Sequence, residues 1–254
     1  MKIFNFTKKI RFKIPAFLIF YTTIFYLYRN SSYYNYRMLI TNIDSIPWLY
    51  STIGLIFGMV AAFIIQKEWQ NWSDLIDAIK GENSALHELW LWSERLEPEI
   101  QNELKSLIKE YLKVIIKEGW KKTEEGEISD ELDTIIKRMH GVMADLNQSQ
   151  PILSSIAFPL LSNIMNYREK RIRFGSGHMP NILLYTLRFA TFLMIALCPL
   201  IAVKDFELHY IFSMSIAFLS YLIYLVAYDM DHPLRPGGWH LTTSDYKKLL
   251  AKLN

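Results

Sequence analysis

Four apolar runs dominate the hydrophobic pattern of this chain. They occupy residues 15–28, 46–66, 180–203 and 206–228. The last three reach the ~20 residues that cross a hydrocarbon core about 30 Å thick, whereas the first is shorter. No small-x-small cleavage site follows the first run, and the tyrosines beyond it are typical of a membrane interface. We therefore interpret it as an uncleaved span, and the pattern predicts four transmembrane helices.

A polar insert, residues 67–179, separates the second run from the third, and its apolar positions recur at helical spacing. Beginning near Pro98, hydrophobic residues repeat every three or four positions opposite a charged face, which predicts an amphipathic helix of about 20 residues. Gly119 suits the end of this helix. Ser129 is expected to cap a further helix, and another is expected to begin after Pro151. The predicted fold class is all-α, a polytopic membrane protein with a cytosolic helical bundle.

These elements divide the chain into four predicted parts. The first, residues 1–66, holds the N-terminal tail and transmembrane helices 1 and 2. A cytosolic helical domain follows at 67–179, then transmembrane helices 3 and 4 at 180–228. Residues 229–254 form a cytosolic C-terminal tail.

Positive charge near the span ends predicts the orientation. Five lysines and arginines precede the first span, whereas the connection to the second carries only Arg29 and Arg37. Positive flanks stay on the cytoplasmic side, so the N-terminus is expected there, and four spans return the insert and the C-terminal tail to the same side.

The distribution of charge also indicates the partners. The chain carries a net charge of +3. The insert, in contrast, has 15 Lys/Arg against 19 Asp/Glu, a balance of −4, so the excess positive charge lies on the membrane-flanking tails. That pattern fits a lipid bilayer with anionic headgroups. A nucleic-acid partner is not expected, since no basic stripe carries interleaved aromatic residues.

The residue types of catalytic and metal sites are present without the usual spacing. Cys198 is the only cysteine and falls within the third span, so no intrachain disulfide is expected. The six histidines are scattered, without a partner three or four residues away: His87, His140, His178, His209, His232 and His240. The sequence therefore predicts no catalytic residue, no metal site and no cofactor, and a membrane enzyme is disfavoured.

Arg188 is the ionisable residue that the pattern places inside a span. It lies eight residues beyond Pro180, about 12 Å along a helix. An arginine at mid-membrane costs at least ~2.5 kcal/mol, so it is expected to face the helix bundle or a water-filled path, or to extend to the inner headgroups. By depth, the nearest possible charge partners are Glu68, Asp229 and Asp231.

The second apolar run contains two further candidate features. Small residues, Gly54, Gly58 and Ala62, recur at four-residue spacing and would allow close helix packing. A neighbouring stripe is formed by Ser51, Leu55, Met59 and Phe63. Around an axis shared by several subunits, this stripe would form an apolar constriction, a pore neck that gates by dewetting. The alternative is that the stripe faces lipid or packs within one subunit.

The order of residues in this second run resembles that of bestrophin channels. Ile46-Pro47, Gly58 and Lys67-Glu68-Trp69 follow one another as do an Ile-Pro pair, a Gly and an Arg-Trp-Trp exit in bestrophins. A bacterial group of bestrophin-like membrane proteins is more similar still. Its pattern fits at positions spread over about two thirds of the chain: Glu82, Leu86, Leu89, Tyr111, Val114, Ile115, Glu118, Trp120, Arg168, Arg171, Asp231-His232-Pro233 and Gly237.

The resemblance implies a four-span subunit that assembles as a ring, for example a pentamer, in a bacterial plasma (inner) membrane. It also implies that the second span lines a narrow neck and that inorganic ions pass through it. By distance from Gly58, the neck positions are Ser51, Leu55 and Met59, where bestrophins carry mainly Ile and Phe. The acidic run that binds calcium in animal bestrophins is absent after Pro233, so no calcium site is expected.

Two functions from different classes follow from these observations. The first is a homo-oligomeric bestrophin-like ion channel with an apolar neck in the second span. The second is a non-conducting membrane-anchored module that binds or signals through the helical insert.

Overall fold

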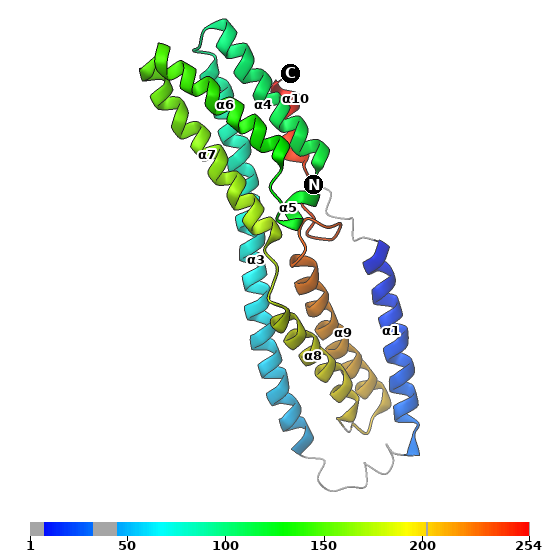
Figure 1. The fold of residues 1–254 in the computed structure, drawn as a ribbon. Helices are drawn as coiled ribbons and strands as arrows, with labels where there is room; N and C mark the ends of the chain where they lie inside the picture. The colour runs from blue at the N-terminus through cyan, green and yellow to red at the C-terminus, as the bar shows by residue number, and fades with distance from the viewer. Residues whose placement is uncertain (1–7, 33–44, 202, 254) are drawn as a thin grey trace. The chain divides into compact units, whose positions relative to one another are not determined.

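The computed structural model describes residues 8–32, 45–201 and 203–253, and this part of the chain is helical without strands (Figure 1). Lys2 and Arg37, on which the predicted orientation partly rests, lie outside the described residues. The described part divides into two compact units. Unit 1 comprises residues 1–69 and 178–239, and unit 2 comprises residues 70–177 and 240–254.

The helices of unit 1 correspond to the four apolar runs. They are α1 (Lys8–Arg29), the first part of α3 (Ser45–Ser93), α8 (Asn181–Leu197), the short 3-10 helix η2 (Cys198–Leu200) and α9 (Phe206–Met230). Three segments of the described chain are long and apolar enough to cross a membrane: Pro47–Ser93, Asn181–Leu200 and Phe206–Met230. The first run also forms a helix, α1, but this helix carries five basic residues, Lys8, Lys9, Arg11, Lys13 and Arg29, and does not belong to this set.

Small and apolar side chains hold unit 1 together. Phe57, Ala61 and Ile64 of α3 pack with Leu187 and Met194 of α8 in one cluster. A second cluster joins α1 to α9 through Tyr21, Phe25 and Ala217. In hydrocarbon such contacts are stabilised by close packing rather than by exclusion of water.

Arg29 fastens the end of α1 to the connection between α8 and α9. Its guanidinium donates to the carbonyl oxygens of Val203 at 2.7 Å and Lys204 at 2.6 Å. These carbonyls belong to a segment that is not helical, so the arginine satisfies backbone groups that would otherwise need water.

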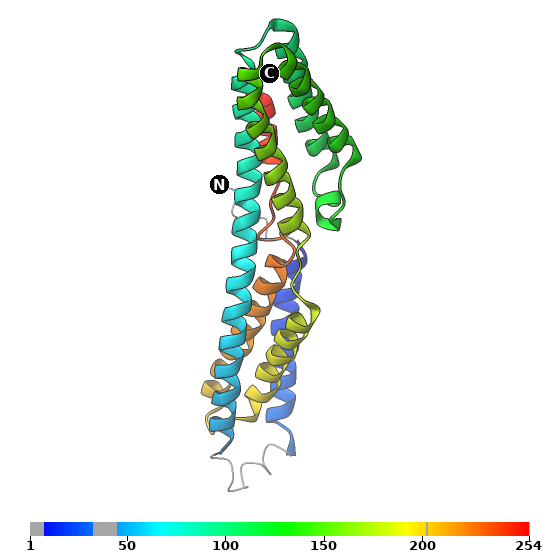
Figure 2. The same cartoon turned by 60° about the vertical axis from the view of Figure 1, so that its left-hand side comes forward.

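Unit 2 confirms the helical insert and adds a C-terminal helix to it. It contains the second part of α3, α4 (Pro98–Glu118), α5 (Lys121–Glu125), α6 (Asp130–Ser149), α7 (Pro151–Ser176) and α10 (Ser244–Leu253). Figures 1 and 2 show α6 and α7 side by side in both views.

The sequence signals at the helix ends of unit 2 are confirmed. Gly119, with φ of 63°, ends α4, and its amide donates to the carbonyl of Ile115. The Ser129 hydroxyl accepts from the Leu132 amide at 3.3 Å and caps α6. Pro159 lies inside α7, and the charged linker after Gly119 contains the five-residue helix α5, which the sequence did not predict.

Candidate functional site

The predicted neck residues lie on an uncovered face of α3. The exposed fractions are 65% for Leu55, 60% for Met59 and 63% for Phe63, and Ser51 is also exposed. This face is wider than the predicted stripe, since it includes further large apolar side chains: Trp48, Leu49 and Ile56. The first part of α3 therefore has one side packed in unit 1 and another that unit 1 leaves uncovered.

The small residues of α3 differ in their surroundings. A Cβ atom added to Gly54 would lie 3.6 Å from Cε of Met194, so α8 packs closely against this glycine. A Cβ on Gly58 would meet nothing within 4 Å, and Ala62 is exposed. Gly54 thus has its packing partner within unit 1, whereas packing at Gly58 and Ala62 stays a prediction that would require another chain.

Arg188 contacts aromatic rings rather than the carboxylates that its depth suggested. Its guanidinium carbon lies 5.8 Å from the ring centre of Tyr185 and 5.9 Å from that of Tyr224. Both distances are within the range of cation–π attraction. The arginine is exposed and lines a mostly apolar cavity of about 510 Å³ formed by α1, α8 and α9.

The three predicted charge partners of Arg188 are placed differently. The Asp229 carboxylate accepts hydrogen bonds from the amides of Gly238 at 2.7 Å and Trp239 at 3.2 Å. Asp231 accepts one from the Met179 amide at 2.6 Å. Glu68 is buried in α3. Both aspartates therefore hold backbone segments that flank the ends of α8 and α9.

Gly237 belongs to the same arrangement. A Cβ atom at this position would overlap the carboxylate of Asp229, so only glycine lets the chain approach it this closely. The Asp-His-Pro and Gly-Gly residues at the end of α9 are visible in the sequence. Their spacing alone does not predict that the Asp229 carboxylate binds the amides of Gly238 and Trp239.

Unit 2 contains a charged cluster that is removed from solvent. Nε of Arg171 on α7 lies 2.6 Å from Oε2 of Glu82 on α3, and both side chains are buried. The hydroxyl of Tyr111 donates to Oε1 of the same carboxylate at 2.5 Å, and that of Tyr246 donates to Oε2 at 2.7 Å. Nη1 of Arg171 donates to the Thr123 hydroxyl at 2.8 Å. Helices α4, α7 and α10 thus meet α3 at one buried carboxylate, and α5 joins the cluster through Arg171.

The electrostatics of this cluster keep the guanidinium of Arg171 charged. Burial alone would lower the pKa of Arg171, but the adjacent Glu82 carboxylate raises it well above the ordinary value. Burial, together with the negative charge of Glu82, raises the pKa of Tyr111 and of Tyr246 well above 10. Both tyrosines therefore remain protonated donors.

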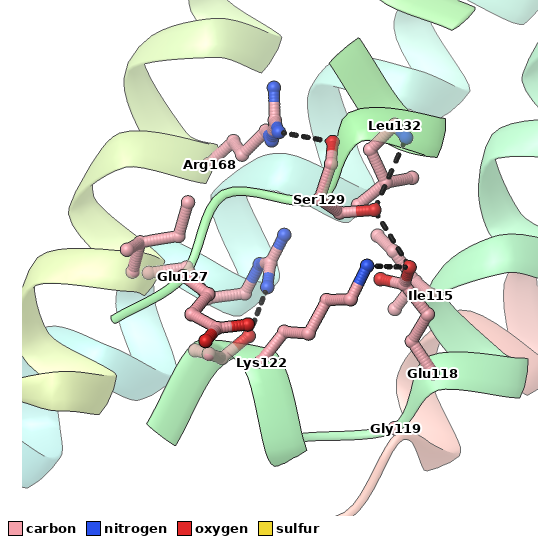
Figure 3. Close-up of a pocket in the computed structure, with 11 residues that line it drawn as sticks. Ile115, Glu118, Gly119, Lys122, Glu127, Ser129, Leu132 and Arg168 are labelled. Carbon is pink, nitrogen blue, oxygen red and sulfur yellow. Dashed lines mark hydrogen bonds and ion pairs between the residues drawn. The ribbon is translucent and has the colours of Figure 1, made fainter. Parts of the chain in front are cut away.

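A second polar group in unit 2 surrounds a narrow pocket (Figure 3). The Ser129 hydroxyl donates to Oε1 of Glu118 at 2.8 Å, and Nζ of Lys122 reaches the same oxygen at 2.9 Å. Arg168 pairs with Asp133 at 2.5 Å and donates to the Ser129 carbonyl. The pocket has a volume of about 10 Å³, so it has room for about one water molecule and not for a substrate.

The sequence of the chain matches the model of a known family. A Bestrophin-like domain matches residues 19–236, which is most of the chain. The chain belongs to this family. No curated protein matches it in sequence.

Solved structures show that the bestrophin-like fold extends over the whole chain. One is a leucine-to-threonine variant of a bacterial bestrophin homologue from Klebsiella pneumoniae, with a TM-score of 0.76 and 11% sequence identity. The alignment covers 100% of this chain and 98% of that one. A tyrosine-to-alanine variant of that homologue gives a TM-score of 0.76 at 12% identity, covering 97% of this chain and 98% of the other. At these identities the likeness establishes the fold alone.

Three of the residues that suggested the family from sequence lie together in the structure. Glu82, Tyr111 and Arg171 were part of that resemblance without an assigned role. The structure brings all three into the buried cluster of unit 2. The bestrophin-like protein is thus a membrane protein of a channel-like rather than an enzymatic family, and the residues that the structure describes form helices without strands.

Proposed function

We propose that this protein is a homo-oligomeric ion channel of the bestrophin-like type, with a neck formed by Ser51, Leu55, Met59 and Phe63 of α3. The observation that carries the proposal is the family match over residues 19–236 combined with the uncovered apolar face of α3. An apolar face is tolerated in lipid, so exposure by itself would not be sufficient. Membership of a channel-like family supplies the reason to place that face on a shared axis.

The chemistry of the neck residues suggests how the pore would be closed. Three of the four side chains are apolar, and none is charged. A ring of such side chains excludes water when it is narrow, and ions then lose their hydration without replacement. Smaller side chains would hold water more readily, so substitution by alanine should favour conduction.

The proposed setting is a bacterial inner membrane, with both termini and unit 2 in the cytoplasm. The basic residues before the first span and the basic C-terminal segment support this orientation. It requires α1 to cross the membrane as a fourth span. Lipid, inorganic ions and further copies of the chain, forming a ring such as a pentamer, would then be the partners.

Single-channel recording of the purified protein in planar bilayers tests the proposal. The double variant Leu55→Ala/Met59→Ala is expected to raise the conductance, because the neck becomes wider and less apolar. The matched control is Ile211→Ala/Leu219→Ala, which shortens two exposed aliphatic side chains of α9. Under an asymmetric salt gradient the reversal potential gives the sign of the permeant ion. Equal effects of the two double variants would remove α3 from the pore.

A non-conducting module acting through unit 2 is the second candidate function. It is favoured by the separate core of unit 2, in which the described contacts of the buried cluster join α3, α4, α5, α7 and α10. Cysteines introduced at Leu55 and Met59 distinguish the two functions. A water-soluble thiol reagent should modify them in a channel, whereas unmodified positions in folded, oligomeric protein would support the module.

A further inference from the structure

Three metal-ligating side chains that are distant in sequence meet at one end of unit 1. His178 lies in the segment before α8, and Asp231 and His232 follow the end of α9. One possible ligand atom from each residue lies within 4.8 Å of the other two. His178 and Asp231 are 53 positions apart in the chain, which explains why local spacing gave no sign of the group.

Hydrogen bonds hold both imidazoles by one nitrogen. Nδ1 of His178 lies 3.0 Å from the carbonyl oxygen of Asp231, and Nδ1 of His232 lies 3.3 Å from that of Tyr228. A carbonyl only accepts, so in the neutral rings the proton is on Nδ1 and the lone pair is on Nε2. Metal-binding histidines are typically oriented in this way, by an N–H bond to a carbonyl or carboxylate.

The rings and the carboxylate are arranged compactly. The two imidazoles are stacked, with ring centres 5.0 Å apart and planes at 29°. The Asp231 carboxylate is buried; Oδ1 accepts from the Met179 amide, and Oδ2 lies 3.4 Å from Nδ1 of His232. A buried carboxylate beside two imidazole rings favours a cation that can use both oxygen and nitrogen ligands.

The ligand set indicates which cation fits. Calcium and magnesium take oxygen ligands, whereas zinc and similar divalent ions combine imidazole nitrogen with carboxylate oxygen. In a tetrahedral zinc site, bonds of about 2.0–2.2 Å bring the ligand atoms to within roughly 3.4 Å of one another. The exposed ring of His178 can make this approach, since α8 begins only at Asn181.

We propose that His178, Asp231 and His232 form a binding site for a divalent transition-metal ion of the zinc type. Water or another ligand would complete the coordination. The bound ion would tie the segment before α8 to the end of α9. The site does not depend on whether the protein conducts ions, and its test uses binding and thermal stability.

The test uses the full chain, purified without a polyhistidine tag, in detergent and treated with a chelator that is then removed. Zinc is titrated at pH 7.5, and bound metal per chain and the melting temperature are measured. Wild type is expected to bind one zinc per chain and to melt at a higher temperature when zinc is present.

His178→Ala and His232→Ala each remove one ligand and should weaken zinc binding by at least about tenfold, with loss of the thermal shift. His87→Ala is the matched control, since His87 lies in unit 2 and should leave both readouts unchanged. Because His178 is exposed, its replacement should not prevent folding. Absence of zinc binding by folded wild type would overturn the proposal, as would wild-type affinity in both ligand variants.

Discussion

Arg171 is the residue on which the interior of unit 2 depends most, because it supplies the positive charge beside the buried Glu82. Its guanidinium makes two hydrogen bonds to that carboxylate, at 2.6 and 3.3 Å. Without it, a carboxylate charge would remain in a buried site with only two tyrosine hydroxyls to stabilise it. Removing one partner of a buried ion pair destabilises a protein much more than replacing both partners with apolar residues.

We predict that Arg171→Met destabilises the protein by about 3–5 kcal/mol. Denaturant unfolding of the full chain in detergent, followed by circular dichroism, measures the loss. Arg138→Met is the control, because the pair between Arg138 and Glu110 is exposed on both sides and should be worth less than about 1 kcal/mol. Similar losses in the two variants would mean that the buried cluster does not stabilise unit 2.

This cluster also shows what the sequence could not provide at the level of single residues. Glu82 and Arg171 are 89 positions apart, and each reads as an ordinary charged residue of a solvated helix face. Only the packing of α3 against α7 makes them a pair. The stripe at Leu55 and Met59, in contrast, was visible from four-residue spacing alone, because its members are neighbours on a single helix.

At the scale of elements, two helical glycines differ in whether a neighbouring helix leaves room for a side chain. Gly81 of α3 faces Tyr167 of α7, and a Cβ atom there would overlap the tyrosine ring. Gly141 of α6 would meet nothing within 4 Å. The two positions have the same residue type inside a helix and opposite requirements for space.

We predict that Gly81→Ala destabilises unit 2 by about 1–3 kcal/mol, since α7 must shift to make room for the methyl group. Gly141→Ala should leave stability unchanged or raise it by up to about 1 kcal/mol, because alanine is the better helix former. Melting temperatures of both variants provide the comparison. An unchanged value for Gly81→Ala would show that the Tyr167 ring moves aside freely.

Helix boundaries were predicted well where a local signal fixed them. Gly119 and Ser129 act through their own backbone or hydroxyl group, so their roles could be inferred without knowledge of the fold. The helix α5 lies in a segment that reads as a charged linker. Its Thr123 is buried and accepts a hydrogen bond from Arg171, a tertiary contact without a sequence signature.

At the scale of the whole molecule, the proposed topology places the connection between α8 and α9 on the periplasmic side of the membrane and unit 2 in the cytoplasm. The protein is well suited to a test by labelling, because its single cysteine, Cys198, is buried. A thiol reagent that does not cross membranes should therefore give little background. Lys204 and Glu125 provide exposed positions in the α8–α9 connection and in unit 2.

We predict that intact cells label Lys204→Cys and that Glu125→Cys is labelled only after the membrane is permeabilised. The positive charge that flanks the first span is the physical reason for this sidedness. Wild type, with Cys198 alone, is the control for background. Labelling of Glu125→Cys in intact cells would reverse the proposed orientation.

The place of α10 in the chain order has a consequence for biosynthesis. This helix belongs to unit 2, but it follows α8 and α9, so the ribosome makes two apolar helices before it makes Tyr246. Until then Oε2 of Glu82 lacks the hydroxyl that binds it in the finished protein. Helices α3 to α7 therefore cannot complete the core of unit 2 until α8 and α9 have been synthesised. The last step in the folding of unit 2 follows the translation of both helices.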